Sequence, residues 1–313
     1  MSDISRVMTG ATERLLAALS PDDMADACLP FGGPARADWS YLPGSRRGIE
    51  LARLNPAGRK AAYRLLGTAL SRPAFAQAVT IMAFEELLDI EEQEELQRHS
   101  DGYYVAIFGT VGDDAWGWRF EGHHVSVNVT VVGGEPVVAP LFLGSNPARV
   151  LDDGDLVAAP LLREESLARD LVTGLPGALR ERAVIAGPAP HDIITAMAAS
   201  TDSRLEPAGV TVAELPADAR GLLSRLLRVY TGRLAPGLAD AERDRIWDAE
   251  TTFAWAGGLR PGDGHYYRIQ GPGLLVEYDN TQRDGNHAHS VLRRPGADFG
   301  ASLLTSHLAS GHP

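Results

Sequence analysis

Histidines gather in the parts of the sequence that predict β-strands. Five of the nine histidines lie in or beside segments that alternate polar and apolar residues, namely His123, His124, His265, His287 and His289. Side chains two apart on a strand point to the same face of a sheet. His287 and His289 of HAHS therefore share a face, as Glu277 and Asp279 of VEYDNTQ do. Imidazoles and carboxylates on a common face can bind a metal ion or transfer protons.

The acidic pair and the histidine pair are predicted to lie close together in a β-hairpin. Asp284-Gly285, between the two segments, is typical of a tight turn. A third imidazole could come from a neighbouring strand, HHVSVNVT, in which His124 lies on the polar face and His123 on the valine face. The polar face also carries Ser126, Asn128 and Thr130.

Three imidazoles and one carboxylate can hold a single divalent metal ion and leave positions open for water, oxygen or substrate. The predicted ligands are His124, His287, His289 and one carboxylate, Glu277 or Asp279. Iron, copper, zinc and manganese all bind such groups, so the sequence does not choose among them. Taken alone, an H-x-H pair on a strand is more often a pair of partly exposed or hydrogen-bonded imidazoles, and the metal hypothesis depends on the convergence of several such patterns. Which of His123 and His124 faces the site also stays open.

The same pocket could work without a metal. Glu277 or Asp279 would then orient His287 or His289 as a general base. Arg268 could bind an anionic substrate, because a guanidinium group suits a carboxylate. The other predicted substrate-binding residues are Arg119, Asn128, Tyr267, Gln270, Asn280 and Gln282. In the competing interpretation, the acids and arginines form cross-strand ion pairs and have a structural role.

Composition narrows the function classes. The chain has 313 residues, 44% of them hydrophobic, and a net charge of -12, so non-specific nucleic-acid binding is not expected. Cys28 is the only cysteine, which leaves no disulfide framework and no cysteine-rich zinc site. No apolar run reaches the roughly 20 residues of a membrane span. We expect a cytoplasmic protein that binds a small-molecule substrate and neither nucleic acid nor membrane; its oligomeric state stays open.

Periodicity predicts the elements that position these residues. Residues 1–100 are predicted to be helical, and Asn55-Pro56 supplies a capping residue and a first-turn proline. The pattern then alternates, which predicts antiparallel strands at about 103–143. Helical periodicity returns from about Leu161 to Thr252. Its last helical run is LADAERDRIWDAETTFAW.

A second strand group is predicted at about 265–293, and FGASLLTSHLAS predicts a short C-terminal helix. Strands, helices and strands in this order indicate an α+β fold. We expect a mostly antiparallel sheet built from both strand groups, with the N-terminal, central and C-terminal helices packed around it. Since no long linker divides the chain, residues 1–313 are predicted to form a single domain. No internal repeat is recognised.

Several longer runs occur in a characteristic order: WGWRFEGHHVSVNVT, FAWAGG, HYYRIQGPGLLVEYDNTQ and NHAHSV. With them the chain resembles the domain-of-unknown-function 3500 family, from about Asn55 to the C-terminus. The resemblance implies that the family hallmarks here are Gly122-His123-His124, Glu277-Tyr278-Asp279-Asn280 and Asn286-His287-Ala288-His289. It implies no reaction, because the family has no assigned activity.

Our leading hypothesis is a metal-dependent oxidoreductase that acts on a small organic substrate. Imidazole and carboxylate ligands with open positions are what non-haem oxygen chemistry uses. A hydrolase or lyase, with or without a metal, would need the same residues. A binding protein that captures a small molecule without reaction is the alternative from another class.

Overall fold

The computed structural model describes residues 2–95, 98–201, 204–246 and 248–310. Its helices are α1 (Asp3–Leu16), α2 (Pro21–Ala27), α3 (Pro56–Ala69), α4 (Arg72–Glu91), α5 (Leu162–Gly174), α6 (Gly177–Ala183), α7 (Ala217–Thr231), α8 (Pro236–Ile246) and α9 (Ala301–Ser310). Its strands are β1 (Cys28–Leu29), β2 (Ile49–Glu50), β3 (Tyr103–Phe108), β4 (Ala115–Gly122), β5 (Val125–Val132), β6 (Glu135–Ser145), β7 (Val150–Asp152), β8 (Asp155–Ala158), β9 (Val184–Ala186), β10 (Val210–Thr211), β11 (Thr252–Gly257), β12 (His265–Gly271), β13 (Leu274–Gln282) and β14 (His287–Arg293). Within the described ranges, none of the helices has the length and apolar character needed to cross a bilayer.

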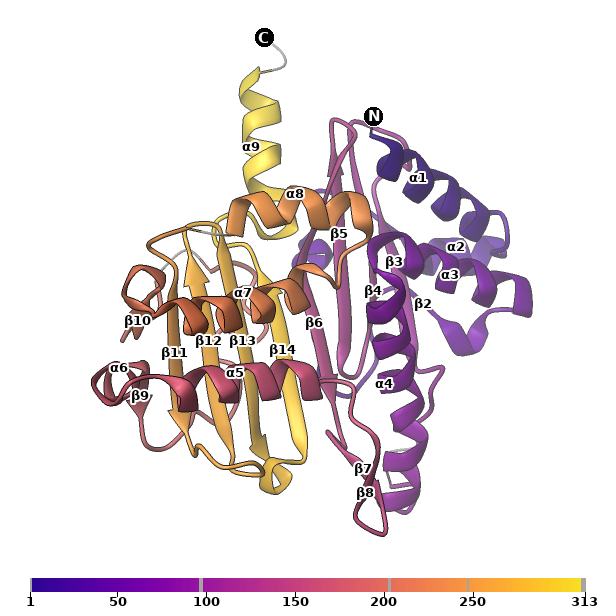
Figure 1. The fold of residues 1–313 in the computed structure, drawn as a ribbon. Helices are drawn as coiled ribbons and strands as arrows, with labels where there is room; N and C mark the ends of the chain where they lie inside the picture. Colours follow the sequence, from indigo (N-terminus) through magenta and orange to yellow (C-terminus); the bar gives the residue numbers. More distant parts are fainter. Residues whose placement is uncertain (1, 96–97, 202–203, 247, 311–313) are drawn as a thin grey trace.

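One large sheet contains both predicted strand groups (Figure 1). Strands β3 to β6 and β11 to β14 form two antiparallel meanders, and β6 pairs with β14 to join them. The sheet has twelve strands in the order β1-β3-β4-β5-β6-β14-β13-β12-β11-β10, with β2 beside β3 and β9 beside β11. Two short pairs, β1–β3 and β9–β11, are parallel. The predicted α+β fold with a mostly antiparallel sheet is confirmed.

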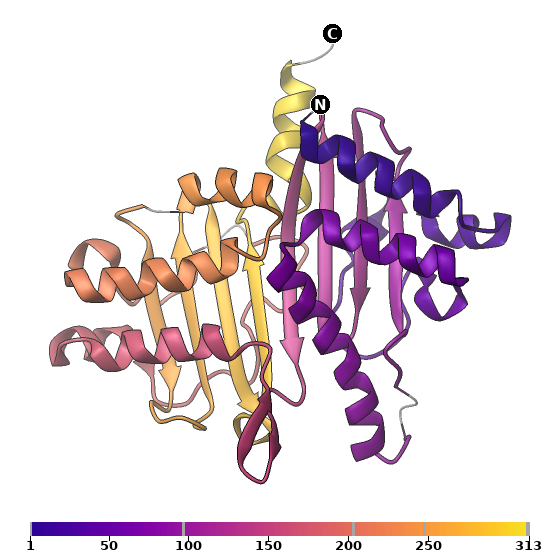
Figure 2. The same ribbon diagram turned by 45° about the vertical axis from the view of Figure 1, so that its right-hand side comes forward.

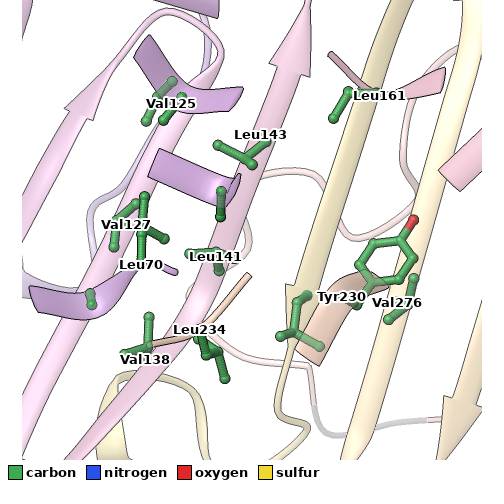
Figure 3. Close-up of a cluster of buried hydrophobic side chains, with 14 of the residues drawn as sticks. Leu70, Val125, Val127, Val138, Leu141, Leu143, Leu161, Tyr230, Leu234 and Val276 are labelled. Atoms are coloured by element: carbon green, nitrogen blue, oxygen red, sulfur yellow. The ribbon is translucent and has the colours of Figure 1, made fainter. Parts of the chain in front are cut away.

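Helices cover one face of this sheet (Figure 2). Helices α1, α3 and α4 lie over the first meander, and α5 and α7 lie over the second. The apolar strand side chains on this face, such as Val127 and Leu141, pack with Leu70 and Leu234 of the helical layer (Figure 3). Burial of such side chains contributes roughly 25 cal/mol per Å² of apolar surface, so this layer stabilises the fold.

Two largely irregular segments, residues 30–48 and 187–201, pack against the opposite face of the sheet. The buried apolar cluster there contains Trp39, Tyr41, Phe142, Ile193, Val291 and Phe299. As the alternation in β5 predicts, Ser126 and Asn128 lie on this face, and both are buried. The polar face of the sheet is therefore enclosed, which lowers the local dielectric constant around its charged groups.

Helix α3 begins where the sequence predicts. The side chain of Asn55 accepts a hydrogen bond from the Gly58 N–H at 2.9 Å, and Pro56 occupies the first turn. Helix α4 begins in the same way, with the Ser71 hydroxyl accepting from the Ala74 N–H. These caps fix the two helices that pack over β5 and β6.

Two local predictions are corrected by the structure. Residues Thr252–Gly257, expected to end a helix, form β11, because Phe253 and Trp255 alternate into the core while the strand pairs with β12. His123 and His124, expected within a strand, form the two-residue connection between β4 and β5. Both segments are too short for their periodicity to decide between the alternatives.

The order of elements repeats once along the chain, although the sequence predicts no repeat. The series α1, α2, β1, β2, α3, α4 and β3–β6 is followed by α5, α6, β9, β10, α7, α8 and β11–β14. In each half, a short parallel strand and a short antiparallel strand both pair with the first strand of the meander. The run WRFEG in β4 corresponds to YRIQG in β12, so that Arg119 matches Arg268.

Candidate metal centre

Three histidine rings converge on the enclosed polar face of the sheet. The Nε2 atom of His287 lies 2.8 Å from the Nε2 atom of His124, and the Nε2 atom of His289 lies 3.2 Å from the same atom. One ring nitrogen from each residue lies within 4.8 Å of the other two. The structure thus brings together the three histidines that the sequence suggests as metal ligands.

The connection between β4 and β5 sets the position of His124. Its backbone is left-handed, with a φ of 62°, which turns the chain sharply. Its N–H donates to the Tyr41 carbonyl at 3.0 Å, and its own carbonyl accepts from the Gly144 N–H at 2.7 Å. A Cβ atom at Gly144 would lie 2.7 Å from Cδ2 of the His124 ring. Glycine at this position therefore makes room for the imidazole.

The predicted hairpin carries the other two histidines. Strands β13 and β14 pair antiparallel, with Asp279 opposite His289 and Gln282 opposite His287. The register shifts between these two pairs, which marks a bulge. On its other side β14 pairs with β6, where His289 is opposite Gly144. Strand pairing therefore holds both histidines beside the connection that carries the third ring.

Burial keeps two of the three imidazoles neutral. It lowers the pKa of His124 well below the usual value, and the neighbouring His123 and His289 lower it further. Burial also lowers the pKa of His287 to about 3, with His289 as the next largest cause. A neutral imidazole keeps the nitrogen lone pair that binds a metal. Near pH 7 both rings can therefore act as ligands.

Two carboxylates lie on the other side of the His289 ring. Asp192 Oδ1 is 2.7 Å from the Nδ1 atom of His289, and Asp192 Oδ2 accepts a hydrogen bond from the Tyr41 hydroxyl at 2.9 Å. Asp279 Oδ2 is 4.0 Å from the same Nδ1 atom, and burial raises the pKa of Asp279 to about 6. Histidines that bind metals usually donate their second ring N–H to such a carboxylate. Asp192 lies where such a carboxylate would be for His289.

Two of the three separations between the ring nitrogens fit a shared metal ion, and the third is at most 4.8 Å. Nitrogens bound to one ion at about 2.0–2.1 Å lie about 3 Å apart. The separations of 2.8 and 3.2 Å around His124 Nε2 match that spacing. Hydrogen bonding alone satisfies the three rings less well. The Nε2 atom of His124 carries either one proton or one lone pair, and it faces two other nitrogens. One cation bound by three lone pairs would satisfy all three rings.

A family model described as "Protein of unknown function (DUF3500)" matches residues 2–301. The chain belongs to the DUF3500 family. The match confirms the resemblance, extends it toward the N-terminus by about fifty residues beyond Asn55, and ends at residue 301. No curated protein and no solved structure matches the chain. Membership in DUF3500 assigns no activity, so function depends on the geometry of the site.

In this DUF3500 protein, His123 belongs to a second cluster. Its Nδ1 atom lies 2.5 Å from Glu85 Oε1 and 3.2 Å from a guanidinium nitrogen of Arg98. Its ring stacks on His124, with the ring centres 3.7 Å apart. Glu85, His123 and His124 are close enough together to hold a metal. Arg98 already supplies a positive charge to this cluster, which disfavours a second cation there.

Glu277, predicted as a ligand and a catalytic residue, has other partners. Its buried carboxylate accepts hydrogen bonds from the backbone and hydroxyl of Thr195, from the Ile194 N–H and from the Tyr266 hydroxyl. Asp279 is the acid that lies opposite His289. Of the two candidate carboxylates, the structure therefore places Asp279 beside the histidines.

Arg268, predicted to clamp an anion, donates instead to the backbone carbonyls of Leu205 and Pro207. Arg119, Asn128 and Gln270 share the enclosed face, and each has a partner of its own, the carbonyl of Ala35, the carbonyl of Pro140 and the N–H of Leu205.

Tyr267 lies on the helix-covered face, with its hydroxyl 2.6 Å from that of Tyr230. Asn280 accepts from the His265 N–H, and Gln282 pairs with His287 at the hairpin end. The structure does not bring Tyr267 or Asn280 into the DUF3500 histidine group.

Three residues of the site escape sequence reasoning: Tyr41, Gly144 and Asp192. Tyr41 and Asp192 lie in irregular segments, where no periodicity predicts which way a side chain points. Gly144 lies near the end of β6, and a strand glycine can mark a close approach by another group. That signal points to Gly144 but not to the ring that it accommodates.

Proposed function

We propose that this DUF3500 protein is a metalloenzyme in which His124, His287 and His289 bind one divalent transition-metal ion, and that it is an oxidoreductase acting on a small organic substrate. The observation that carries the proposal is the approach of the His287 and His289 ring nitrogens to Nε2 of His124, at 2.8 and 3.2 Å. Glu277 is left out of this ligand set because its oxygens have other partners.

The donor set supports redox chemistry. Imidazole nitrogens suit iron, copper and zinc, and three protein ligands leave positions for oxygen, water or substrate. His287 is the only partly exposed ring of the three, so these molecules would approach from its side. Tyr41 and Phe142 pack against His289, with ring centres 5.1 and 5.5 Å away, and these rings would exclude water from the opposite side.

A hydrolase or lyase is the second candidate. It is favoured by the bond between His289 and Asp192, because a carboxylate–histidine pair is the usual outer support of a catalytic zinc ion. Zinc held by three histidines lowers the pKa of a bound water to about 7 and so supplies hydroxide near neutral pH. In this version Asp192 fixes the ring and its tautomer, as it does in the oxidoreductase.

Elemental analysis of protein purified without a polyhistidine tag tests the metal site. We expect about one transition-metal ion per chain in the wild type, near zero in His287→Ala, and no change in His99→Ala. His99 is an exposed histidine outside the group, so its variant controls for adventitious binding. Substoichiometric metal that His287→Ala leaves unchanged would overturn the site and favour a binding protein without a metal.

The reaction class is tested on the metal-loaded protein. Oxygen uptake with small organic substrates, or a colour that depends on bound iron or copper, supports the oxidoreductase. Zinc content combined with ester or amide hydrolysis, and no oxygen uptake, would replace it with the hydrolase. His287→Ala must abolish whichever activity is found.

A further inference from the structure

An arginine-rich pocket of about 450 Å³ lies apart from the histidine group. It is lined by Asp38, Ser40, Ser45, Arg46, Arg47 and Arg119. The three histidines are not among these lining residues. The three guanidinium groups therefore have no role in the proposed metal centre.

Arg119 lies at the buried end of this pocket. Its side chain is only 2% exposed, and it donates to the Ala35 carbonyl at 3.1 Å. Its Nε atom lies 3.2 Å from Glu121 Oε1, without hydrogen-bond geometry. The Nε atom of Arg46 lies 3.5 Å from the same oxygen and also lacks a hydrogen bond. Two buried guanidinium groups thus share one carboxylate oxygen, which leaves positive charge incompletely balanced.

The pocket wall is held in place before any ligand arrives. Arg46 donates to the carbonyls of Leu42, Gly44 and Ser45, and so fixes its own loop. The second oxygen of Glu121 accepts from the Ser40 N–H at 2.8 Å. Arg46, Arg47 and Arg119 line the pocket together with Asp38, and Glu121 lies beside two of these arginines, so three positive groups face two negative ones. One further negative charge would balance them.

The internal repeat provides a comparison. Arg268 of β12 corresponds to Arg119 of β4, and the neutral Gln270 corresponds to Glu121. Two backbone carbonyls, those of Leu205 and Pro207, accept from the Arg268 guanidinium. In the first half the matching arginine instead lines a pocket together with two further arginines. Both arginines keep buried nitrogens without a hydrogen-bond partner, so the difference lies in the pocket: Arg119 faces it together with two further guanidinium groups, an arrangement that suits an anion.

We infer that this pocket is a binding site for a small molecule that bears a carboxylate or phosphate group, held by the guanidinium groups of Arg47 and Arg119. The inference goes beyond the proposed metal centre and does not depend on it. Guanidinium groups bind both anions through paired N–H donors, so the two ligand classes share one recognition chemistry.

Isothermal titration calorimetry on the full-length protein tests the inference, with inorganic phosphate and succinate as separate probes at constant ionic strength. We expect saturable binding of at least one probe, with a Kd below about 1 mM. Arg47→Ala should weaken it about fivefold or more, and Arg119→Gln should abolish it. Arg64 is an exposed arginine on α3, and Arg64→Ala should leave the binding of the probe unchanged.

The outcomes of the titrations identify the ligand class and test whether the pocket is an anion site. Binding of phosphate alone assigns a phosphate ligand, and binding of succinate alone assigns a carboxylate; either supports the site. Arg119→Gln is read only if circular dichroism shows a native fold, and the exposed Arg47 carries the test otherwise. No saturable binding of either probe with a Kd below about 1 mM, or an equal loss in Arg64→Ala, would overturn the inference.

Discussion

Asp192 Oδ1 lies 2.7 Å from the Nδ1 atom of His289, on the side of the ring opposite the nitrogen that meets His124. The aspartate is almost a hundred residues from the histidine in the sequence. Its second oxygen accepts from Tyr41, which ties both irregular segments of the enclosed face to one ring. A carboxylate in this position fixes the tautomer that leaves Nε2 free for a cation.

Replacing Asp192 by Asn should weaken metal binding about 10–100-fold, because the amide keeps the shape of the side chain but loses its negative charge. Competition with a chromophoric chelator measures the affinity. Asp170→Asn, an exposed aspartate of α5, is the matched control and should not change it. Equal affinities for wild type and Asp192→Asn would remove Asp192 from the site.

Replacing Gly144 by Ala should displace the His124 ring, because the new Cβ would lie 2.7 Å from its Cδ2 atom. We expect metal affinity to fall about tenfold or more and stability to fall by about 1–3 kcal/mol. Gly221→Ala in helix α7 is the control: its Cβ meets nothing within 4 Å, and alanine should stabilise the helix by about 0.5–1 kcal/mol. Unchanged metal affinity in Gly144→Ala would contradict the placement of His124.

The pair His123→Asn and His124→Asn separates the two neighbouring clusters. Asparagine tolerates the left-handed backbone of His124, so this variant should fold but bind no metal. His123→Asn should keep the metal and lose about 1–3 kcal/mol of stability, because Glu85 loses its imidazole partner. Metal loss of the same size in both variants would show that the ligand assignment is wrong.

His265 should make stability depend on pH. Burial lowers its pKa from the usual 6.5 to about 4, so between these values the unfolded chain takes up a proton that the folded chain does not. Above about pH 6.5 the titration of His265 does not change the free energy of unfolding. On acidification it lowers this free energy by up to about 1.4 kcal/mol per pH unit, and the effect stops growing below about pH 4.

His265→Phe removes this titration and keeps a ring stacked on Trp255. Urea unfolding at about pH 7.5 and pH 4 should show the wild type losing about 3 kcal/mol more than the variant. Parallel losses in the two proteins would mean that His265 is not the group responsible.

Much of the candidate site follows from the sequence. Alternation on both sides of Asp284-Gly285 predicts the β13–β14 hairpin, and the structure places Asp279 opposite His289 as that hairpin requires. Glu277 shares the same face but lies two residues, about 7 Å, further along the strand. It therefore meets Thr195 of an irregular segment instead of the histidines. Alternation with a period of two predicts which face of the sheet a side chain lies on, but not how far along the strand it lies from the histidines.

The parts of the site and fold that the sequence does not predict depend on long-range packing. The His124 ring reaches His287 only because β6 pairs with β14, a contact between residues far apart in sequence. Asp192 reaches the site through the path of an irregular segment, which no local pattern encodes. The repeat of elements is similarly hidden, because similar packing needs only apolar residues at corresponding positions and leaves little identity beyond runs such as WRFEG and YRIQG.

Anomalous diffraction from crystals of the tag-free protein tests the metal centre most directly. Data on both sides of the absorption edge of the bound ion locate that ion without reference to the protein atoms. We predict one peak at about 2.0–2.2 Å from the Nε2 atoms of His124, His287 and His289. A peak beside Glu85 and His123 instead, or no peak near the three rings in crystals grown with the ion, would contradict the account.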